Sequence, residues 1–167
     1  VYKRQVLMST TIYNCNAILD QAIFKNIANL QGYPANDISE WNGIYTGKYK
    51  TLINVPISIA SALAASSVPA LTAAYTNGKK EAVRSQINTA IRFIMVVAFP
   101  CAVGMGVLAS PILQLLFRDS SELAASMLQL GAVSIVFFSL STLSNGLLQG
   151  INRMREPVKN ALIALVL

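Results

Sequence analysis

The chain has 167 residues, of which 54% are hydrophobic and 12% are charged, and it contains no histidine. Its mean hydropathy is +0.52, whereas soluble domains carry about a quarter of their residues as charges. This composition excludes an ordinary water-soluble globular domain and indicates that the lipid bilayer is the solvent. The net charge of +6 comes from short basic clusters between apolar runs, a pattern typical of membrane orientation rather than nucleic-acid binding.

The first apolar run predicts a membrane helix over about residues 6–28, although it contains Asp20 and Lys25. Spacings of 4, 3 and 4 place four polar side chains on one face of this helix: Ser9, Tyr13, Asn16 and Asp20. An ionisable residue at membrane depth costs about 2–3 kcal/mol, so we expect Asp20 to face a cavity, a cation or a basic partner. Asp20 is therefore a candidate ion-coupling residue, and Asn16 is a candidate substrate-binding residue. The alternative is that Asp20 and Lys25 reach water at the membrane interface and simply end the helix.

A second helix is expected over about residues 50–72, in an uncharged run that contains Pro56 and Pro69. Small residues such as Ala62 and Ser66 would allow a neighbouring helix to pack closely. Proline can kink a helix, so we treat both prolines as candidate hinges. The alternative is that proline and small residues are simply common in membrane helices.

A third helix is predicted over about residues 87–109. Arg84, Asn88 and Arg92 recur every four residues around its start, which gives the helix a basic and polar face. Because a guanidinium presents a planar fork of donors, Arg92 is a candidate contact for a pyrophosphate, and Arg84 is a second candidate. The alternative is that both arginines anchor the helix to anionic lipid headgroups. Pro100 lies within the same helix and is a third candidate hinge.

A fourth helix is expected over about residues 122–149, and Asp119 or Ser120 is expected to cap it. Spacings of 7, 4 and 4 produce a second polar line: Ser134, Ser141, Asn145 and Gln149. We treat Asn145 and Gln149 as candidate substrate-binding residues. Hydrogen bonds between helices would explain these two residues equally well.

A fifth helix is expected over residues 157–167, where the chain ends inside an apolar stretch. The chain is thus interpreted as a fragment of an all-α polytopic membrane protein with a single membrane domain. Lysine and arginine are dense in every second segment between the predicted helices. The positive-inside rule then places the Val1 end and Lys79 in the cytoplasm, and Asp37 and Asp119 outside.

Few side chains in the sequence are suited to catalysis. Without histidine there is no Ser-His or Cys-His pair, and the two cysteines, Cys15 and Cys101, have no CxxC spacing. No glycine-rich phosphate loop precedes a helix. We therefore expect no catalytic residues, no metal, no cofactor and no nucleic-acid partner, and we do not expect the protein to be an enzyme.

Several short motifs follow one another along nearly the whole chain: Gly43-Ile44-Tyr45-Thr46-Gly47, Val55-Pro56, Ser67-Val68-Pro69-Ala70-Leu71, Phe99-Pro100 and Leu147-Leu148-Gln149-Gly150. In this order they resemble the polysaccharide and lipid-oligosaccharide flippases of the multidrug/oligosaccharidyl-lipid/polysaccharide exporter superfamily. The closest likeness is to the stage V sporulation protein B group. The resemblance implies about fourteen helices in two lobes around a central cavity, of which this chain would supply roughly the seventh to the start of the eleventh.

The resemblance further implies a function in transport. The substrate would be a polyprenyl-pyrophosphate-linked sugar, such as a cell-wall precursor, moved by alternating access and driven by a gradient rather than by ATP. Arg92 and Arg84 would bind the pyrophosphate, while Asn16, Asn145 and Gln149 would hydrogen-bond the sugar. The implied partners are membrane lipids, the lipid-linked sugar and a coupling cation or proton, in the bacterial plasma membrane. Two alternatives stay open: a cation-coupled multidrug exporter of the same superfamily, and a non-transporting membrane scaffold for cell-wall or spore assembly.

Overall fold

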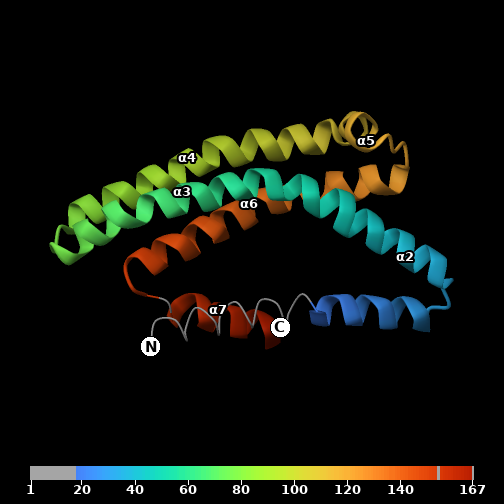
Figure 1. Ribbon diagram of the computed structural model, residues 1–167, viewed down its shortest axis with the longest axis horizontal. Helices are drawn as coiled ribbons and strands as arrows, with labels where there is room; N and C mark the ends of the chain where they lie inside the picture. Colours follow the sequence, from blue (N-terminus) through green and yellow to red (C-terminus); the bar gives the residue numbers. More distant parts are fainter. Residues whose placement is uncertain (1–17, 154, 167) are drawn as a thin grey trace. The chain divides into compact units, whose positions relative to one another are not determined.

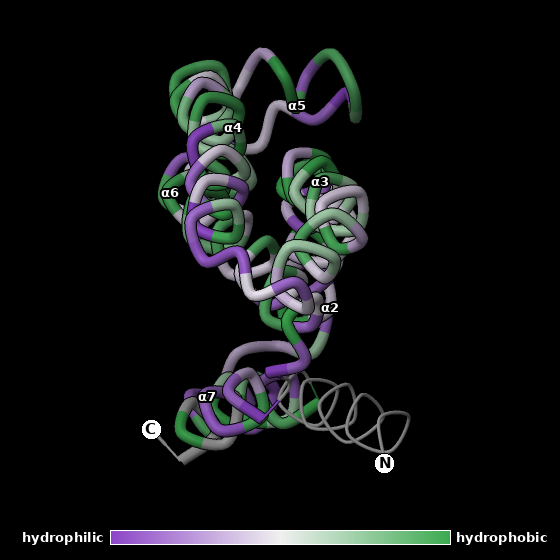
Figure 2. Tube along the Cα trace, turned by 90° about the vertical axis from the view of Figure 1, so that its left-hand side faces the viewer, coloured by the Kyte–Doolittle hydropathy of each residue, from purple (hydrophilic) through white to green (hydrophobic). Residues whose placement is uncertain are grey.

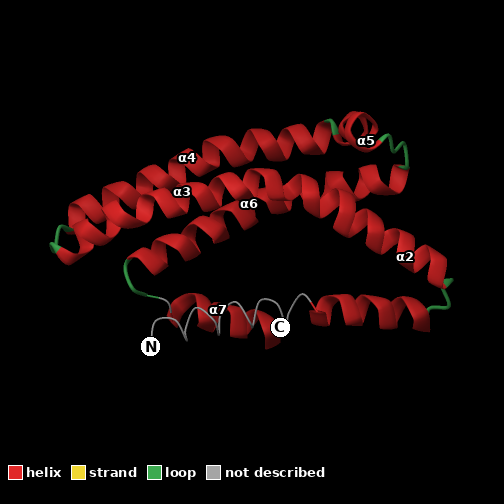
Figure 3. Ribbon diagram, viewed as in Figure 1, coloured by secondary structure: helices red, strands yellow, loops and turns green. Residues whose placement is uncertain are grey.

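The computed structural model describes residues 18–153 and 155–166, and all regular secondary structure in those ranges is helical (Figure 1, Figure 3). A helix over residues 18–30 comes first. The other elements follow in the order α2 (Ala35–Gly43), the π-helical segment η1 (Ile44–Tyr49), α3 (Lys50–Thr76), α4 (Lys80–Val107), α5 (Ala109–Phe117), α6 (Glu122–Gly150) and α7 (Arg155–Val166).

Three helical stretches in the described part of the chain are long and apolar enough to cross a membrane: Ala35–Thr76, Lys80–Val107 and Glu122–Gly150. A helix rises 1.5 Å per residue, so each stretch exceeds the thickness of about 30 Å of a bilayer's hydrocarbon core. The prediction of an all-α membrane protein is confirmed.

The chain divides into two compact units, one of residues 42–151 and the other of residues 1–41 with 152–167. The sequence interpretation treated the chain as one membrane domain. In the larger unit, α4 begins at Lys80 rather than near residue 87. The reason is that Val83, Ile87 and Ile91 pack against the core of this unit, so the polar beginning of the run is an amphipathic helix.

Within the larger unit, α6 lies against both α3 and α4 (Figure 1, Figure 2). The Tyr49 hydroxyl, just before α3, is 3.0 Å from the Ser134 hydroxyl. At the other end of α3, the Thr72 hydroxyl donates to the Gly150 carbonyl at 2.6 Å. The second contact joins residues that come later in both segments than those of the first. The helices α3 and α6 therefore run in the same direction, and α4 runs in the opposite direction.

Small residues set the spacing between α3 and α6. A Cβ built on Gly146 would lie 2.5 Å from the Cβ of Ala64, far inside van der Waals contact. Helices in membranes gain attraction mainly from close packing, and small residues permit it. The face of α3 that meets α6 contains the buried Ala60 and Ala64, whereas Ala62 and Ser66, which the sequence had suggested for close packing, are exposed.

Two apolar clusters form the core of the larger unit. At the end where α4 begins, the first joins α3, α4 and α6: Ala60, Ala64, Leu71, Ala90, Ile94, Leu143 and Leu147. At the end where α4 stops, the second includes residues of η1 and α5: Ile44, Leu52, Ile53, Ala102, Ala109, Leu113, Ala124, Leu128, Ala132 and Ile135. Among the described residues, the one buried polar side chain is Ser139 of α6, whose hydroxyl has no hydrogen-bond partner there.

The prolines lie inside continuous helices, with Pro56 and Pro69 in α3 and Pro100 in α4. Pro56 is buried, whereas Pro69 and Pro100 are exposed. A proline leaves the carbonyl four residues earlier without its helical donor, so each is a point where bending costs less. Their candidate role as hinges stays a prediction.

The residue that caps α6, in the loop between α5 and α6, is not one of those predicted from the sequence. The N-cap of α6 is Ser121, whose hydroxyl accepts a hydrogen bond from the Ala124 N–H at 3.4 Å. The predicted caps, Asp119 and Ser120, were therefore wrong. Asp119 instead accepts a hydrogen bond from the Ser121 N–H at 2.9 Å, which holds the loop that places the cap.

In the smaller unit, the helix over residues 18–30 is followed by a turn at Gly32, whose φ of +81° lies in the left-handed region that favours glycine. The rings of Tyr33 and Trp41 then meet edge to face at 5.0 Å. In α7, Lys159 and Glu156 form an exposed ion pair at 3.5 Å. The candidate residue Asn16 lies outside the described residues.

Candidate substrate-binding face

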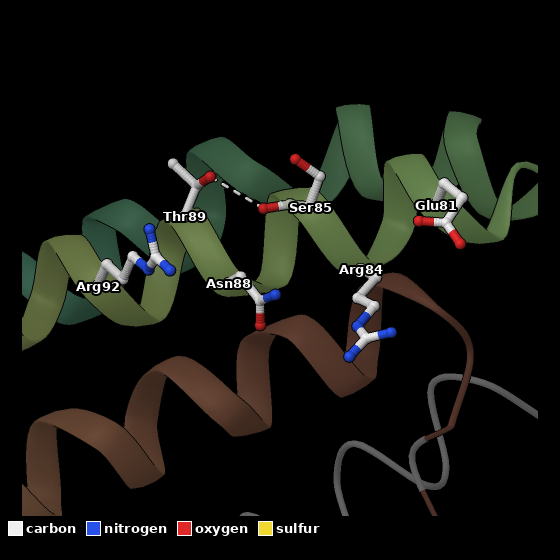
Figure 4. Close-up of a pocket in the computed structure, with 6 residues that line it drawn as sticks. All are labelled: Glu81, Arg84, Ser85, Asn88, Thr89 and Arg92. Atoms are coloured by element: carbon white, nitrogen blue, oxygen red, sulfur yellow. Dashed lines mark hydrogen bonds between the residues drawn. The ribbon is translucent and has the colours of Figure 1, made fainter.

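The polar side of α4 forms a hollow of about 410 Å³. All of its lining residues come from this helix: Glu81, Arg84, Ser85, Asn88, Thr89 and Arg92. Figure 4 shows Ser85 and Thr89 on one side of the helix and Arg84 and Asn88 on the other, with Glu81 and Arg92 at opposite ends. Arg84, Asn88 and Arg92, which the sequence places on one helical face, are thus brought together.

The helical period explains why these residues gather. Ala90 and Ile94 are buried in the core, and Ile87 packs against the same cluster. Side chains on the other face of this helix must then point away from the core. Arg84 and Arg92 are accordingly exposed.

The two arginines lie at different depths along α4. At 1.5 Å per residue, Arg84 is about 6 Å and Arg92 about 18 Å from Lys80, where the helix begins. The two residues are therefore separated by about 12 Å along the axis. Arg92 lies well inside the long apolar helix, whereas Arg84 lies close to its beginning.

The positive charge of the two arginines on this face is available to an anionic ligand. No residue in the described ranges forms an ion pair with Arg84 or Arg92. The Thr89 hydroxyl is occupied, because it donates to the Ser85 carbonyl at 2.9 Å. Two guanidinium groups with an amide between them provide hydrogen-bond donors and positive charge for an anion, and phosphate groups fit such donors well.

A second hollow, of about 370 Å³, lies between α3 and α4 and was missed by the sequence analysis. Its lining contains Ser66 and Ser67 of α3 together with Ser85, Gln86 and Thr89 of α4. The Gln86 Oε1 atom is buried and has no hydrogen-bond partner among the described residues. The only sequence signal was the serine and threonine content of both helices, which also suits plain helix packing.

The other candidate residues lie outside the hollow on α4. Asn145 is half-buried and Gln149 is exposed, and both are on α6. Asp20 is an exposed residue of the helix over residues 18–30, in the smaller unit. Ser134 had been expected in the polar line with Asn145, but its hydroxyl contacts the Tyr49 hydroxyl at 3.0 Å, so it has a structural partner.

A polar cluster at the Val107 end of the larger unit was also missed. Lys48 of η1 forms an ion pair with Asp119. The hydrogen bond from Lys48, followed by that from the Ser121 N–H, holds the pKa of Asp119 below its ordinary value of 3.8. A depressed folded-state pKa stabilises the fold above that ordinary value, and the contribution is lost as pH falls through the folded-state pKa.

The Tyr49 ring explains why residue 131, in the same region, is a glycine. A Cβ built on Gly131 would collide with the Tyr49 ring, and the Tyr49 hydroxyl donates to the Gly131 carbonyl at 3.4 Å. The π-helical turn of η1 is thus held against α6 by its aromatic ring and against the α5–α6 loop by Lys48. A π-helical segment is rare and often marks a functional site.

A family model described as the lipid II flippase MurJ matches residues 7–167. The chain belongs to the MurJ lipid II flippase family. It is 29% identical over 127 residues to the lipid II flippase MurJ of Bacillus subtilis (strain 168), covering 74% of this chain and 23% of the relative. It is 26% identical over 149 residues to the probable lipid II flippase MurJ of Bdellovibrio bacteriovorus, covering 85% of this chain and 28% of the relative.

The chain therefore spans about a quarter of the length of these two MurJ relatives. No solved structure matches it significantly. MurJ proteins are flippases rather than enzymes, so membership of the family confirms the superfamily inferred from the motifs and the expectation that the protein is not an enzyme.

Proposed function

We propose that the protein moves a polyprenyl-pyrophosphate-linked cell-wall precursor across the bacterial plasma membrane. The observation that supports this most directly is the face of α4, where Arg84, Asn88 and Arg92 line one hollow, with Glu81 at its end, and neither arginine forms an ion pair among the described residues. An unpaired guanidinium within a membrane helix is costly unless it meets an anion or water. The relatives' names give lipid II, whose pyrophosphate is such an anion, as the substrate.

Arg92 and Arg84 have distinct roles in this proposal. Arg84, close to the beginning of α4, attracts the pyrophosphate from the membrane surface, and Arg92, about 12 Å further along the helix, draws it inward. Asn88 lies between them and donates to phosphate or sugar oxygens. Asn145, Gln149 and Asn16 are proposed to hydrogen-bond the sugar.

In this proposal the protein transports its substrate by alternating access. Pro56, Pro69 and Pro100 lower the cost of bending α3 and α4 as the cavity changes the side to which it opens. Asp20 takes up a cation or proton, so that a gradient drives the cycle in place of ATP. The Lys80 end of α4 lies in the cytoplasm, as does the Val1 end of the chain.

The finer assignment to the stage V sporulation protein B group stays a prediction. Under this assignment, the transported cell-wall precursor is used in spore formation. Deletion of the gene in a spore-forming host would then impair spores while leaving vegetative growth unchanged. A growth defect without a spore defect would instead favour a general role in the cell wall.

The test is flipping of a polyprenyl-pyrophosphate sugar by the full-length protein in liposomes. Arg92→Ala removes a charge-assisted hydrogen bond worth about 1.5–3 kcal/mol, so substrate binding should weaken roughly 10- to 100-fold. Arg92→Lys keeps the charge but loses the planar fork, so we expect an intermediate loss. Lys79→Ala is the matched control, because Lys79 is a basic residue beside α4 that does not line the hollow.

Three results would overturn the proposal. Equal binding by the wild type and both Arg92 variants would remove this face of α4 from the site. Transport of a lipophilic cationic dye without binding of the sugar lipid would favour a multidrug exporter. Absence of any transport by an intact, membrane-inserted protein would favour a scaffold.

A further inference from the structure

The short helix α5 has an orientation and a surface that the proposed function does not use. It lies crosswise to α4 and α6: Figure 1 views it almost end-on while α4 and α6 run across the picture, and Figure 2, turned by 90°, shows it from the side. It connects the end of α4 at Val107 to the beginning of α6 at Glu122. Because both neighbours are long enough to cross a membrane, α5 lies at the level where they leave the bilayer.

The side chains of α5 divide into three sectors around the helix. Ala109 and Leu113 are buried in the core and attach the helix to the bundle. At 100° per residue, Ser110 and Gln114 form a polar flank on one side, where the Gln114 amide donates to the Ser110 hydroxyl at 3.2 Å. Pro111 and Leu115 form the apolar flank, which lies about 100° further around the helix, on the side opposite the buried residues, and the Leu115 side chain is 84% exposed.

The end of the bundle beside α5 carries further exposed apolar side chains. Val107 and Leu108, which come directly before α5, and Leu123, near the beginning of α6, are exposed. A bundle helix exposes such residues where acyl chains cover it. Lipid that covers the end of α4 therefore also reaches Leu115.

The end of α5 carries a charge suited to lipid headgroups. Arg118 follows the helix directly and has a left-handed backbone with φ of 52°, and its side chain is exposed. Interfacial helices commonly combine an apolar side in the acyl region with a polar side in water and basic residues at headgroup level. α5 and the Arg118 that follows it together have all three features.

We propose that α5 is an interfacial helix, with Pro111 and Leu115 inserted among the acyl chains of the leaflet nearest the end of α4, and with Ser110 and Gln114 facing water. In this position it anchors the loop that carries Asp119. Since Asp119 pairs with Lys48, the lipid surface also restrains the π-helical turn of η1. This inference concerns the contact with lipid and does not depend on the identity of the transported substrate.

The test measures the depth of two adjacent positions in the membrane. Leu115→Cys and Gln114→Cys are each made in full-length protein lacking its native cysteines, labelled with a nitroxide and placed in phospholipid vesicles. Accessibility to oxygen, which concentrates among acyl chains, is compared with accessibility to a water-soluble nickel complex. We expect the label at 115 to favour oxygen and the label at 114 to favour nickel, at least several-fold in opposite directions.

Reference positions define the two limits of this comparison. Val133→Cys, on the exposed side of α6, reports the acyl region, and Ser120→Cys, in the exposed loop, reports water. Pro111→Cys, on the same flank as Leu115, provides an independent second reading. Because all of these side chains are exposed, the substitutions leave the core intact.

The proposal fails in two distinguishable ways. If the labels at 115 and 111 are as accessible to nickel as the label at 120, the apolar flank lies in water. If these labels are poorly accessible to both reagents, another part of the protein covers the flank. Neither result would touch the pyrophosphate proposal, which is tested by flipping activity.

Discussion

The contact between Gly146 and Ala64 allows a quantitative prediction about how α3 and α6 pack. In Gly146→Ala the new Cβ would lie 2.5 Å from the Cβ of Ala64, about 1–1.5 Å short of ordinary carbon contact at about 3.5–4.0 Å. Neither methyl group can rotate away, so the helices must separate. Overpacking of this kind costs about 1–3 kcal/mol, and we expect Gly146→Ala to lower thermal stability by that amount.

Gly104→Ala is the matched control, because a Cβ at Gly104 in α4 meets nothing within 4 Å. Alanine favours a helix over glycine by about 1 kcal/mol, so this variant should be as stable as the wild type or more stable. The measurement is thermal unfolding of the full-length protein in detergent, followed by loss of the monodisperse peak in size-exclusion chromatography.

A compensating substitution tests the stated cause. Ala64→Gly removes the opposing Cβ and leaves the Ala64 Cα, at 3.6 Å, as the nearest atom to the new methyl group. The double variant should therefore be more stable than the sum of the two single changes predicts, by about 1–3 kcal/mol of coupling. Additive effects, or a Gly146→Ala protein as stable as Gly104→Ala, would refute the close-packing argument.

Three further predictions follow from single residues. Asp119→Asn should lower thermal stability at neutral pH through loss of the Lys48 ion pair. The difference from the wild type should shrink as pH falls below about 3.8, where Asp119 of the unfolded chain is protonated, and should vanish below the lowered pKa of Asp119 in the fold; a constant difference would contradict this. Asp20→Asn should reduce transport in vesicles more than it reduces the amount of protein in the membrane, since removing a charge eases insertion; normal transport would return Asp20 to an interfacial role. In protein without native cysteines, an impermeant maleimide should label Asp37→Cys but not Lys79→Cys in intact cells, and the reverse pattern would overturn the proposed orientation.

The sequence alone determined the membrane class, the helical content and the polar face of α4. These features depend on composition and on the helical period, which are properties of neighbouring residues. Arg84, Asn88 and Arg92 recur every four residues, so they had to share a face in any helix. The order of short motifs likewise predicted the superfamily, which the match to the MurJ family confirms.

Only the tertiary structure decided which distant residues meet. Gly146 faces Ala64, and Asp119 pairs with Lys48 instead of capping α6. Ser134 belongs to the same polar line as Asn145 in the sequence, yet its hydroxyl is engaged by Tyr49, more than eighty residues earlier. A polar side chain on a helix looks the same in the sequence whether it faces a cavity, lipid or a neighbouring helix. Its partner depends on the register between helices, which is set by packing over their full length.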